Sequence, residues 1–135
     1  MYTEDEKKFL SRCVLCPREC GADMFAGRNG YCETDAGINI ASVCVHKGEE
    51  PVICGRNGIC NIFFTGCNLR CKYCQNHEIS LPENRLEPSF RRLEDTLDEI
   101  EKHLLQGVKT IGFVSPMHVV PQVKAIICGL NKTKG

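Results

Sequence analysis

Phe63–Asn76 reads FFTGCNLRCKYCQN, and this stretch decides both the fold class and the chemistry that we expect of the chain. Its cysteines, Cys67, Cys71 and Cys74, form a Cys-x3-Cys-x2-Cys pattern directly after an apolar run. We call Cys67–Cys74 the cysteine loop. Three thiolates on one short loop can hold three irons of a cubane iron–sulfur cluster, which normally takes four cysteine ligands. The remaining iron would stay open to a substrate, and an open metal position indicates catalysis. The alternative is a structural zinc site completed by Cys60 or His77.

Two apolar runs predict parallel strands around this loop. Ile59–Phe64 is nearly continuous in apolar residues, as in a strand buried on both faces, and Lys109–Val114 is a second run of this type. Apolar residues at helical spacing predict a helix over about Phe90–Gln106 with Gly107 as its C-cap, and a second helix over Val119–Leu130. The order strand, helix, strand, helix implies parallel pairing by right-handed crossover. The cysteine loop then lies at a strand's C-terminal end, where α/β folds place their active sites.

Composition divides the chain into two predicted domains, residues 1–57 and 58–135. The first is rich in Cys and Gly without a long period, which predicts a small loop-dominated module held by metal. The second has room for about two βα units, since each takes on the order of 30 residues. We therefore expect a truncated enzyme. Its exposed edge strand, Ile111–Val114, should recruit a complementary chain or aggregate.

Bulk composition excludes several functional classes. The 135 residues are 42% hydrophobic and 25% charged, as in an ordinary globular chain. The 17 basic and 17 acidic residues balance, so no basic excess favours nucleic acid or anionic lipid. No signal-peptide core or membrane-length apolar stretch is present. The 11 cysteines are odd in number and have chelating spacings, which favours metal ligation in a reducing cytoplasm over disulfides.

A second group of cysteines precedes the strands. Four thiols within 20 residues, in a Cys-x2-Cys-x3-Cys-x11-Cys pattern, predict a closed four-coordinate site with a structural role. Zinc and a second iron–sulfur cluster both suit these soft ligands, and four unligated thiols are the remaining alternative. We call these residues the first cysteine group: Cys13, Cys16, Cys20 and Cys32. No role is assigned to the isolated cysteines Cys44, Cys54, Cys60 and Cys128.

Two histidines are open to a functional and a structural interpretation. His46, with Glu49 and Glu50, either positions a substrate or proton or belongs to a polar turn before Pro51. His118 follows the second strand, so it either contacts a cofactor or substrate or simply begins a helix.

The cysteine loop, with aromatic Tyr73 before its last cysteine, resembles the radical S-adenosylmethionine (SAM) superfamily. Five motifs in order narrow the resemblance to the branch usually called pyruvate formate-lyase activating enzyme-like. The similarity runs from about Cys13 to Leu130. The motifs are Cys13–Cys20, Gly27–Cys32, His46–Pro51, Cys71–Asn76 and Pro116–Pro121.

This resemblance implies a partial (β/α)6 barrel, a [4Fe-4S] cluster and bound SAM. The three cysteines of the loop would ligate the cluster, while Tyr73 would lie near the adenine. Ser115 and His118 are candidate cofactor-binding residues at the end of the second strand. That end reads Ser-Pro-Met-His where the branch typically has Thr-Pro-Thr-His, and the Gly-Gly-Glu that holds the methionine amino group in many relatives is absent.

The chemistry implied is anaerobic and reductive. A reductant such as flavodoxin or ferredoxin would supply an electron through the cluster, and cleavage of SAM would give methionine and a 5′-deoxyadenosyl radical. Backbone amides of Asn68–Lys72 would hydrogen-bond the cluster sulfurs. The target would be a glycyl-radical enzyme or another protein. The alternatives are a catalytically inert metal-binding fragment and a zinc-binding interaction module.

Overall fold

A three-stranded mixed sheet forms the centre of the fold, with β2 between its two neighbours. The computed structural model describes residues 1–27, 30–81 and 91–133. The strands are β1 (Ile40–His46), β2 (Ile59–Phe64) and β3 (Thr110–Val114). Strand β2 pairs antiparallel with β1 and parallel with β3. The described part of the chain is therefore a mixed α/β fold in which β1 and β3 are the edges.

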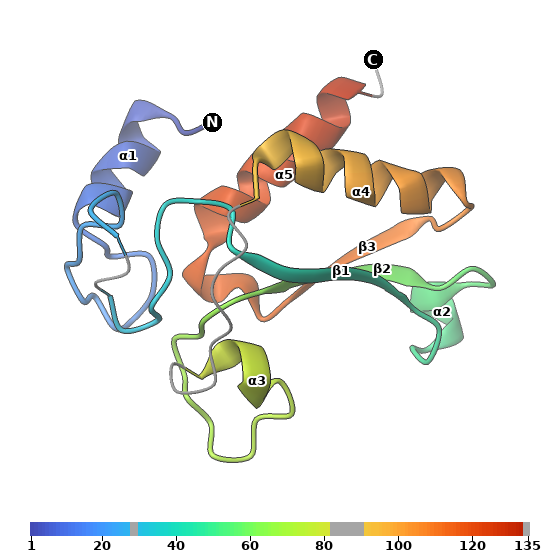
Figure 1. The fold of residues 1–135 in the computed structure, drawn as a ribbon, viewed down its shortest axis with the longest axis horizontal. Coiled ribbons are helices and arrows are strands. Elements are labelled where there is room, and N and C mark those ends of the chain that lie inside the picture. The colour runs from blue at the N-terminus through green and yellow to red at the C-terminus, as the bar shows by residue number, and fades with distance from the viewer. Residues whose placement is uncertain (28–29, 82–90, 134–135) are drawn as a thin grey trace.

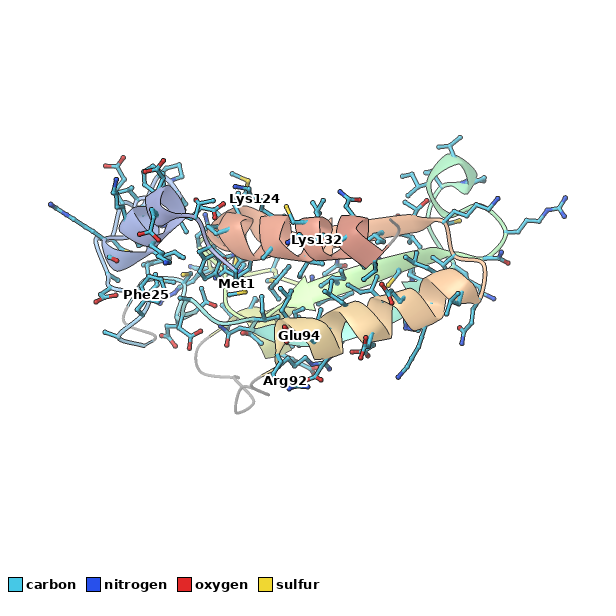
Figure 2. The ribbon with its side chains drawn as sticks, turned by 90° about the horizontal axis from the view of Figure 1, so that it is seen from above. Met1, Phe25, Arg92, Glu94, Lys124 and Lys132 are labelled. Carbon is cyan, nitrogen blue, oxygen red and sulfur yellow. The ribbon has the colours of Figure 1, made fainter. Side chains whose placement is uncertain are left out.

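Two long helices lie together on one face of this sheet (Figure 1). They are α4 (Leu93–Leu105) and α5 (Val120–Thr133), which contact each other and run side by side when seen from above (Figure 2). None of the described helices has the length and apolar character needed to cross a membrane. The shorter helices are α1 (Glu4–Ser11), α2 (Pro51–Cys54), α3 (His77–Ser80) and a 3-10 helix at Pro116–His118.

Most elements predicted after residue 57 are confirmed with small shifts. Strand β2 has the predicted bounds, and the parallel pairing of β2 with β3 is confirmed. Helix α4 begins at Leu93, while its predicted start at Phe90 lies outside the described residues. Gly107 follows the helix with a φ of 94°, which is the conformation expected of a glycine at this position. The prediction of a fully buried β3 is wrong, because all its residues are half-buried at the sheet edge.

Three described elements in the first part of the chain were not predicted from the sequence: α1, β1 and the short α2. The prediction that residues 1–57 are dominated by loops is wrong for β1, which lies in this part and pairs with β2. A lone edge strand among cysteine-rich turns has little periodicity of its own, and its partner comes later in the chain. Helix α1 did have a readable signal, a capping box in which the Glu6 N–H donates to the Thr3 hydroxyl over 3.3 Å.

Among the described residues, the buried apolar side chains form two separate cores. The larger one lies between the sheet and its helices and includes Ile62, Ile100 and Ile126, each 0% exposed. The smaller one is built around the first cysteine group, with Leu10 and Met24 at 0% and 1% exposure. Strand β1 contributes to the larger core although it precedes residue 57. The division into residues 1–57 and 58–135 stays a prediction.

The smaller core approaches the end of the central strand closely at Gly66. Just after β2, Gly66 turns the chain with a φ of 75°. A Cβ atom at Gly66 would overlap the carbonyl oxygen of Cys32. Both the left-handed conformation and this contact therefore require glycine, and together they position the start of the cysteine loop.

We predict that Gly66→Ala lowers the free energy of unfolding by about 2 kcal/mol or more, because it adds a backbone overlap to the usual cost of a left-handed alanine. Urea unfolding followed by circular dichroism measures this loss. Gly21→Ala is the matched control, since Gly21 has a φ of 67° but open space around its Cβ position. Equal losses in the two variants would contradict the role of the Cys32 contact.

Candidate functional site

The cysteine loop is closed at its base, between β2 and α3. The Gly66 N–H donates a hydrogen bond to the Ile79 carbonyl oxygen over 2.9 Å. Within the loop, the Cys74 N–H bonds to the Cys71 carbonyl oxygen over 3.2 Å. The three cysteines therefore lie on one short closed loop at the C-terminal end of the central strand.

A small cavity of about 50 Å³ lies at the C-terminal ends of β2 and β3. Because these two strands are parallel, their carboxyl ends meet at the same edge of the sheet. The cavity brings together two cysteines of the loop, Cys67 and Cys74, with the strand-end candidates Ser115 and His118. Neither Cys71 nor Tyr73 lines it, and Tyr73 is 90% exposed.

His118 is the most buried ionisable side chain of this cavity, at 4% exposure. Its Nε2 lies 3.1 Å from the Thr65 carbonyl oxygen, so the neutral ring donates its N–H to that carbonyl. Burial lowers the pKa of His118, while the carbonyl oxygens of Thr65 and Ser115 oppose the shift. Among the described residues, Nδ1 has no hydrogen-bond partner. The neutral ring therefore carries a free acceptor at Nδ1.

The loop sulfurs have polar neighbours that suit thiolate ligands. The Leu69 N–H donates to Cys67 Sγ over 3.4 Å. The predicted contacts of the Asn68–Lys72 amides with cluster sulfurs stay a prediction. Cys74 Sγ lies 3.3 Å from the Ser80 hydroxyl oxygen. In the described ranges, however, no three His, Cys, Asp or Glu side chains come close enough together to hold a metal ion. The donor chemistry fits an iron–sulfur cluster, and the sulfurs would have to converge to bind it.

The thiols of the first cysteine group interact with one another electrostatically. Burial raises the pKa of Cys13 and of Cys32, and the nearby Cys20 adds to both shifts. Burial acts in the same sense on Cys20, but hydrogen bonds from the backbone of Ala22 and Tyr31, from the Cys13 side chain and from the Cys20 backbone together lower the pKa of that thiol. Amide donors around sulfur are typical of thiolate sites. The predicted metal of this group, zinc or a second cluster, stays a prediction.

The structure does not bring His46 into this site. His46 pairs with Ile59 at the start of β2, the opposite end from the cysteine loop. Its Nε2 lies 3.8 Å from Glu49 Oε1 on a half-exposed surface. Of the two interpretations, the polar turn before Pro51 fits this position.

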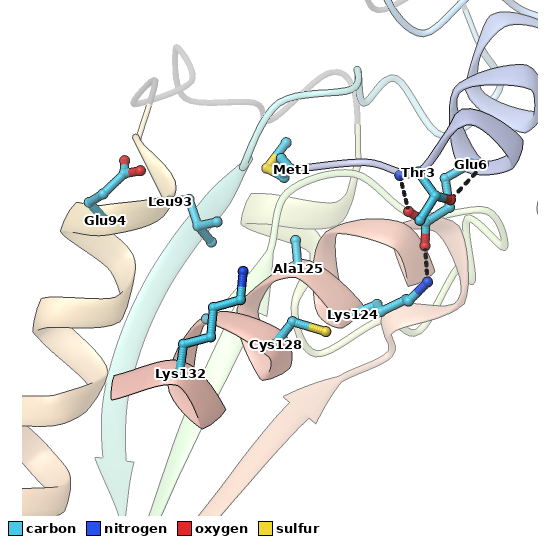
Figure 3. Close-up of a pocket in the computed structure, with 10 residues that line it drawn as sticks. Met1, Thr3, Glu6, Leu93, Glu94, Lys124, Ala125, Cys128 and Lys132 are labelled. Carbon is cyan, nitrogen blue, oxygen red and sulfur yellow. Dashed lines mark hydrogen bonds and ion pairs between the residues drawn. The ribbon is translucent and has the colours of Figure 1, made fainter. Parts of the chain in front are cut away.

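A larger cavity, of about 600 Å³, lies between α1, α4 and α5 (Figure 3). An ion pair of 2.6 Å between Lys124 and Glu6 stands at its edge, and Cys128 and Lys132 also line it. No residue of the cysteine loop borders it. The candidate site is therefore the smaller cavity. No sequence motif indicated Ser80, which lines this cavity, or Thr65, whose carbonyl oxygen accepts a hydrogen bond from His118.

Comparison with known proteins gives a family match over the segment that contains this candidate site. No solved structure matches the chain. The uncharacterized protein MJ0674 of Methanocaldococcus jannaschii is 32% identical over 80 residues, which are 59% of this chain and 22% of that protein. The chain thus spans about a fifth of the length of this relative. Residues 61–119, which include the whole cysteine loop and His118, match the family model of the Radical SAM superfamily.

Proposed function

We propose that this chain binds a [4Fe-4S] cluster through Cys67, Cys71 and Cys74 and takes part in the reductive cleavage of SAM. One observation carries the proposal. Cys67 and Cys74 line the same cavity as His118, at the ends of parallel strands and within the segment that matches the Radical SAM superfamily. This is the edge of an α/β sheet at which ligands bind.

The chain's own residues would hold and surround the cofactors. Three thiolates would ligate three irons, and the Leu69 N–H would stabilise the Cys67 sulfur. When bound, the cluster supplies the electron that breaks a carbon–sulfur bond of SAM. His118 Nδ1 offers a buried acceptor for a donor group of SAM, with Ser115 beside it in the cavity. Tyr73, on the exposed side of the loop, would lie near the adenine.

Apolar side chains also line part of the small cavity and would limit water near a reactive radical. Phe63 and Phe64 come from β2, Val114 from β3 and Ile79 from α3. Phe64 also stacks with Phe113, with ring centroids 6.4 Å apart. Exclusion of water is needed because a carbon radical must meet its substrate before side reactions consume it.

The finer assignment rests on the motif resemblance. We propose that β2, α4, β3 and α5 are the first βα units of a partial (β/α)6 barrel, and that the first cysteine group forms a metal-binding module with zinc or a second cluster. The protein would be an activase-like enzyme of the pyruvate formate-lyase activating type. It would work anaerobically in the cytoplasm, take its electron from flavodoxin or ferredoxin and act on a protein substrate.

A second candidate function is an inert metal-binding fragment. The open edge at β3 favours it, since this strand is only half-buried and pairs with β2 alone among the described strands. Such a fragment would assemble the cluster without holding SAM productively.

Anaerobic reconstitution with iron, sulfide and reductant tests the cluster. We expect Cys71→Ala to bind about four fewer iron atoms per chain than the wild type, because loss of one of three ligands opens the cluster. Iron analysis and electron paramagnetic resonance measure this. Cys128→Ala, which removes an exposed cysteine of α5, should keep the full iron content. Zinc in both cysteine groups with no iron uptake would contradict the proposal.

Incubation of the reconstituted protein with SAM and dithionite separates the enzyme from the inert fragment. We expect 5′-deoxyadenosine and methionine in equal amounts, because one-electron cleavage of one bond releases methionine and a 5′-deoxyadenosyl radical, and this radical becomes 5′-deoxyadenosine when it takes a hydrogen atom from a donor in the mixture. Liquid chromatography with mass spectrometry quantifies them. An intact cluster with no 5′-deoxyadenosine would favour the inert fragment.

His118→Gln tests the buried acceptor. We expect unchanged iron content and about tenfold weaker SAM binding, because one hydrogen bond in a buried site is lost. SAM-induced changes in the paramagnetic resonance spectrum give the affinity. His46→Gln, at the opposite end of β2, should bind SAM as the wild type does. An unchanged affinity in folded His118→Gln would remove His118 from the cofactor site.

A further inference from the structure

Two arginines from different parts of the chain lie against the same tyrosine ring. The guanidinium carbon Cζ of Arg18 is 4.0 Å from the ring centroid of Tyr31, and that of Arg70 is 4.1 Å from it. Arg18 and Tyr31 lie in the segment between Cys13 and Cys32, which carries the first cysteine group, whereas Arg70 directly precedes Cys71 of the cysteine loop. The stacking therefore joins the two groups of cysteines. Both arginines lie inside the sequence motifs, but the motifs by themselves assign no role to either side chain.

Hydrogen bonds to the backbone reinforce this stacking in both directions. Arg18 Nε donates to the carbonyl oxygen of Asn68 over 2.9 Å, so the first cysteine group holds the backbone of the loop. Arg70 Nη2 donates to the carbonyl oxygen of Tyr31 over 2.8 Å, so the loop holds the backbone of the first group. Glu33 Oε1 lies 3.7 Å from the same Arg70 nitrogen. Arg70 is thus held by ring stacking, by a hydrogen bond and by the nearby Glu33 carboxylate.

The backbone of Arg70 adopts a conformation that needs such support. Its φ is 59°, in the left-handed region that is unfavourable for a residue with a Cβ atom. Such a conformation persists where the surroundings impose it. On the other side of the loop, Gly66 contacts the carbonyl oxygen of Cys32, which follows Tyr31 in the sequence. Neighbouring residues Tyr31 and Cys32 therefore contact the chain at two places, at Arg70 within the cysteine loop and at Gly66 just before it.

We propose that Arg18, Tyr31 and Arg70 form a brace that orders the cysteine loop before its cluster is bound. All three are positioning residues, since none supplies a ligand. A loop ordered in advance loses less conformational entropy on binding, so the brace would slow loss of the cluster. The slower loss of the cluster rests on the proposed function, whereas the ordering of the loop in the metal-free protein does not.

Amide hydrogen exchange in the metal-free protein tests the brace without any cluster. We expect Tyr31→Leu to speed exchange about tenfold at the Gly66 and Cys74 amides, both hydrogen-bonded in the structure, because both cation–π contacts are lost. Exchange within β2 should not change, which shows that the variant is folded. Tyr31→Phe keeps the ring and the backbone carbonyl and should behave as the wild type. Unchanged loop exchange in Tyr31→Leu would overturn the proposal.

Release of iron to a chelator after anaerobic reconstitution tests the consequence. Tyr31→Leu and Arg70→Lys should lose iron about tenfold faster than the wild type, because a lysine cannot stack its charge on the ring as a guanidinium does. Arg56→Ala, an exposed change in the turn before β2, is the control. Equal release rates would overturn the brace. A wild type without iron would instead contradict the proposed function, and the exchange result would still decide the brace.

Discussion

The contact between Gly66 and the carbonyl oxygen of Cys32 is the constraint on which the rest of the site depends. It occurs where the central strand of the sheet ends and the cysteine loop begins. The absence of a side chain lets two backbone segments from different cores touch, and the left-handed turn at Gly66 directs the loop along the first cysteine group. The loop is therefore held from two sides, by the sheet and by the cysteine-rich segment.

The parallel pairing of β2 and β3 explains why His118 belongs to the same site as the loop cysteines. It places the carboxyl ends of both strands at one edge, and His118 then bonds across that edge to the Thr65 carbonyl. Burial keeps the ring neutral by lowering its pKa, which leaves Nδ1 able to accept a hydrogen bond. A neutral acceptor beside the loop cysteines adds no positive charge to the candidate site.

The interaction between the two cysteine groups gives the first one a role beyond its own stability. Arg18 and Tyr31 come from turns that have no regular secondary structure, and both reach the cysteine loop. A metal bound by the first cysteine group, as we propose, would also fix these two residues. Order in one cysteine group would then favour order in the other through direct contacts, without a change in the sheet.

The sequence alone predicted β2, β3, α4 and α5 from the periodicity of apolar residues, and it indicated the cysteine loop as the candidate site from the spacing of its cysteines. Both signals depend on neighbours a few residues apart. It missed β1, whose partner strand comes later in the chain, and it left open whether His46 belongs to the site. Only the tertiary structure decided that His46 lies at the far end of β2 and that Tyr31 meets Arg70. These contacts join residues far apart in the sequence, so strand pairing and backbone approach determine them, and local pattern does not.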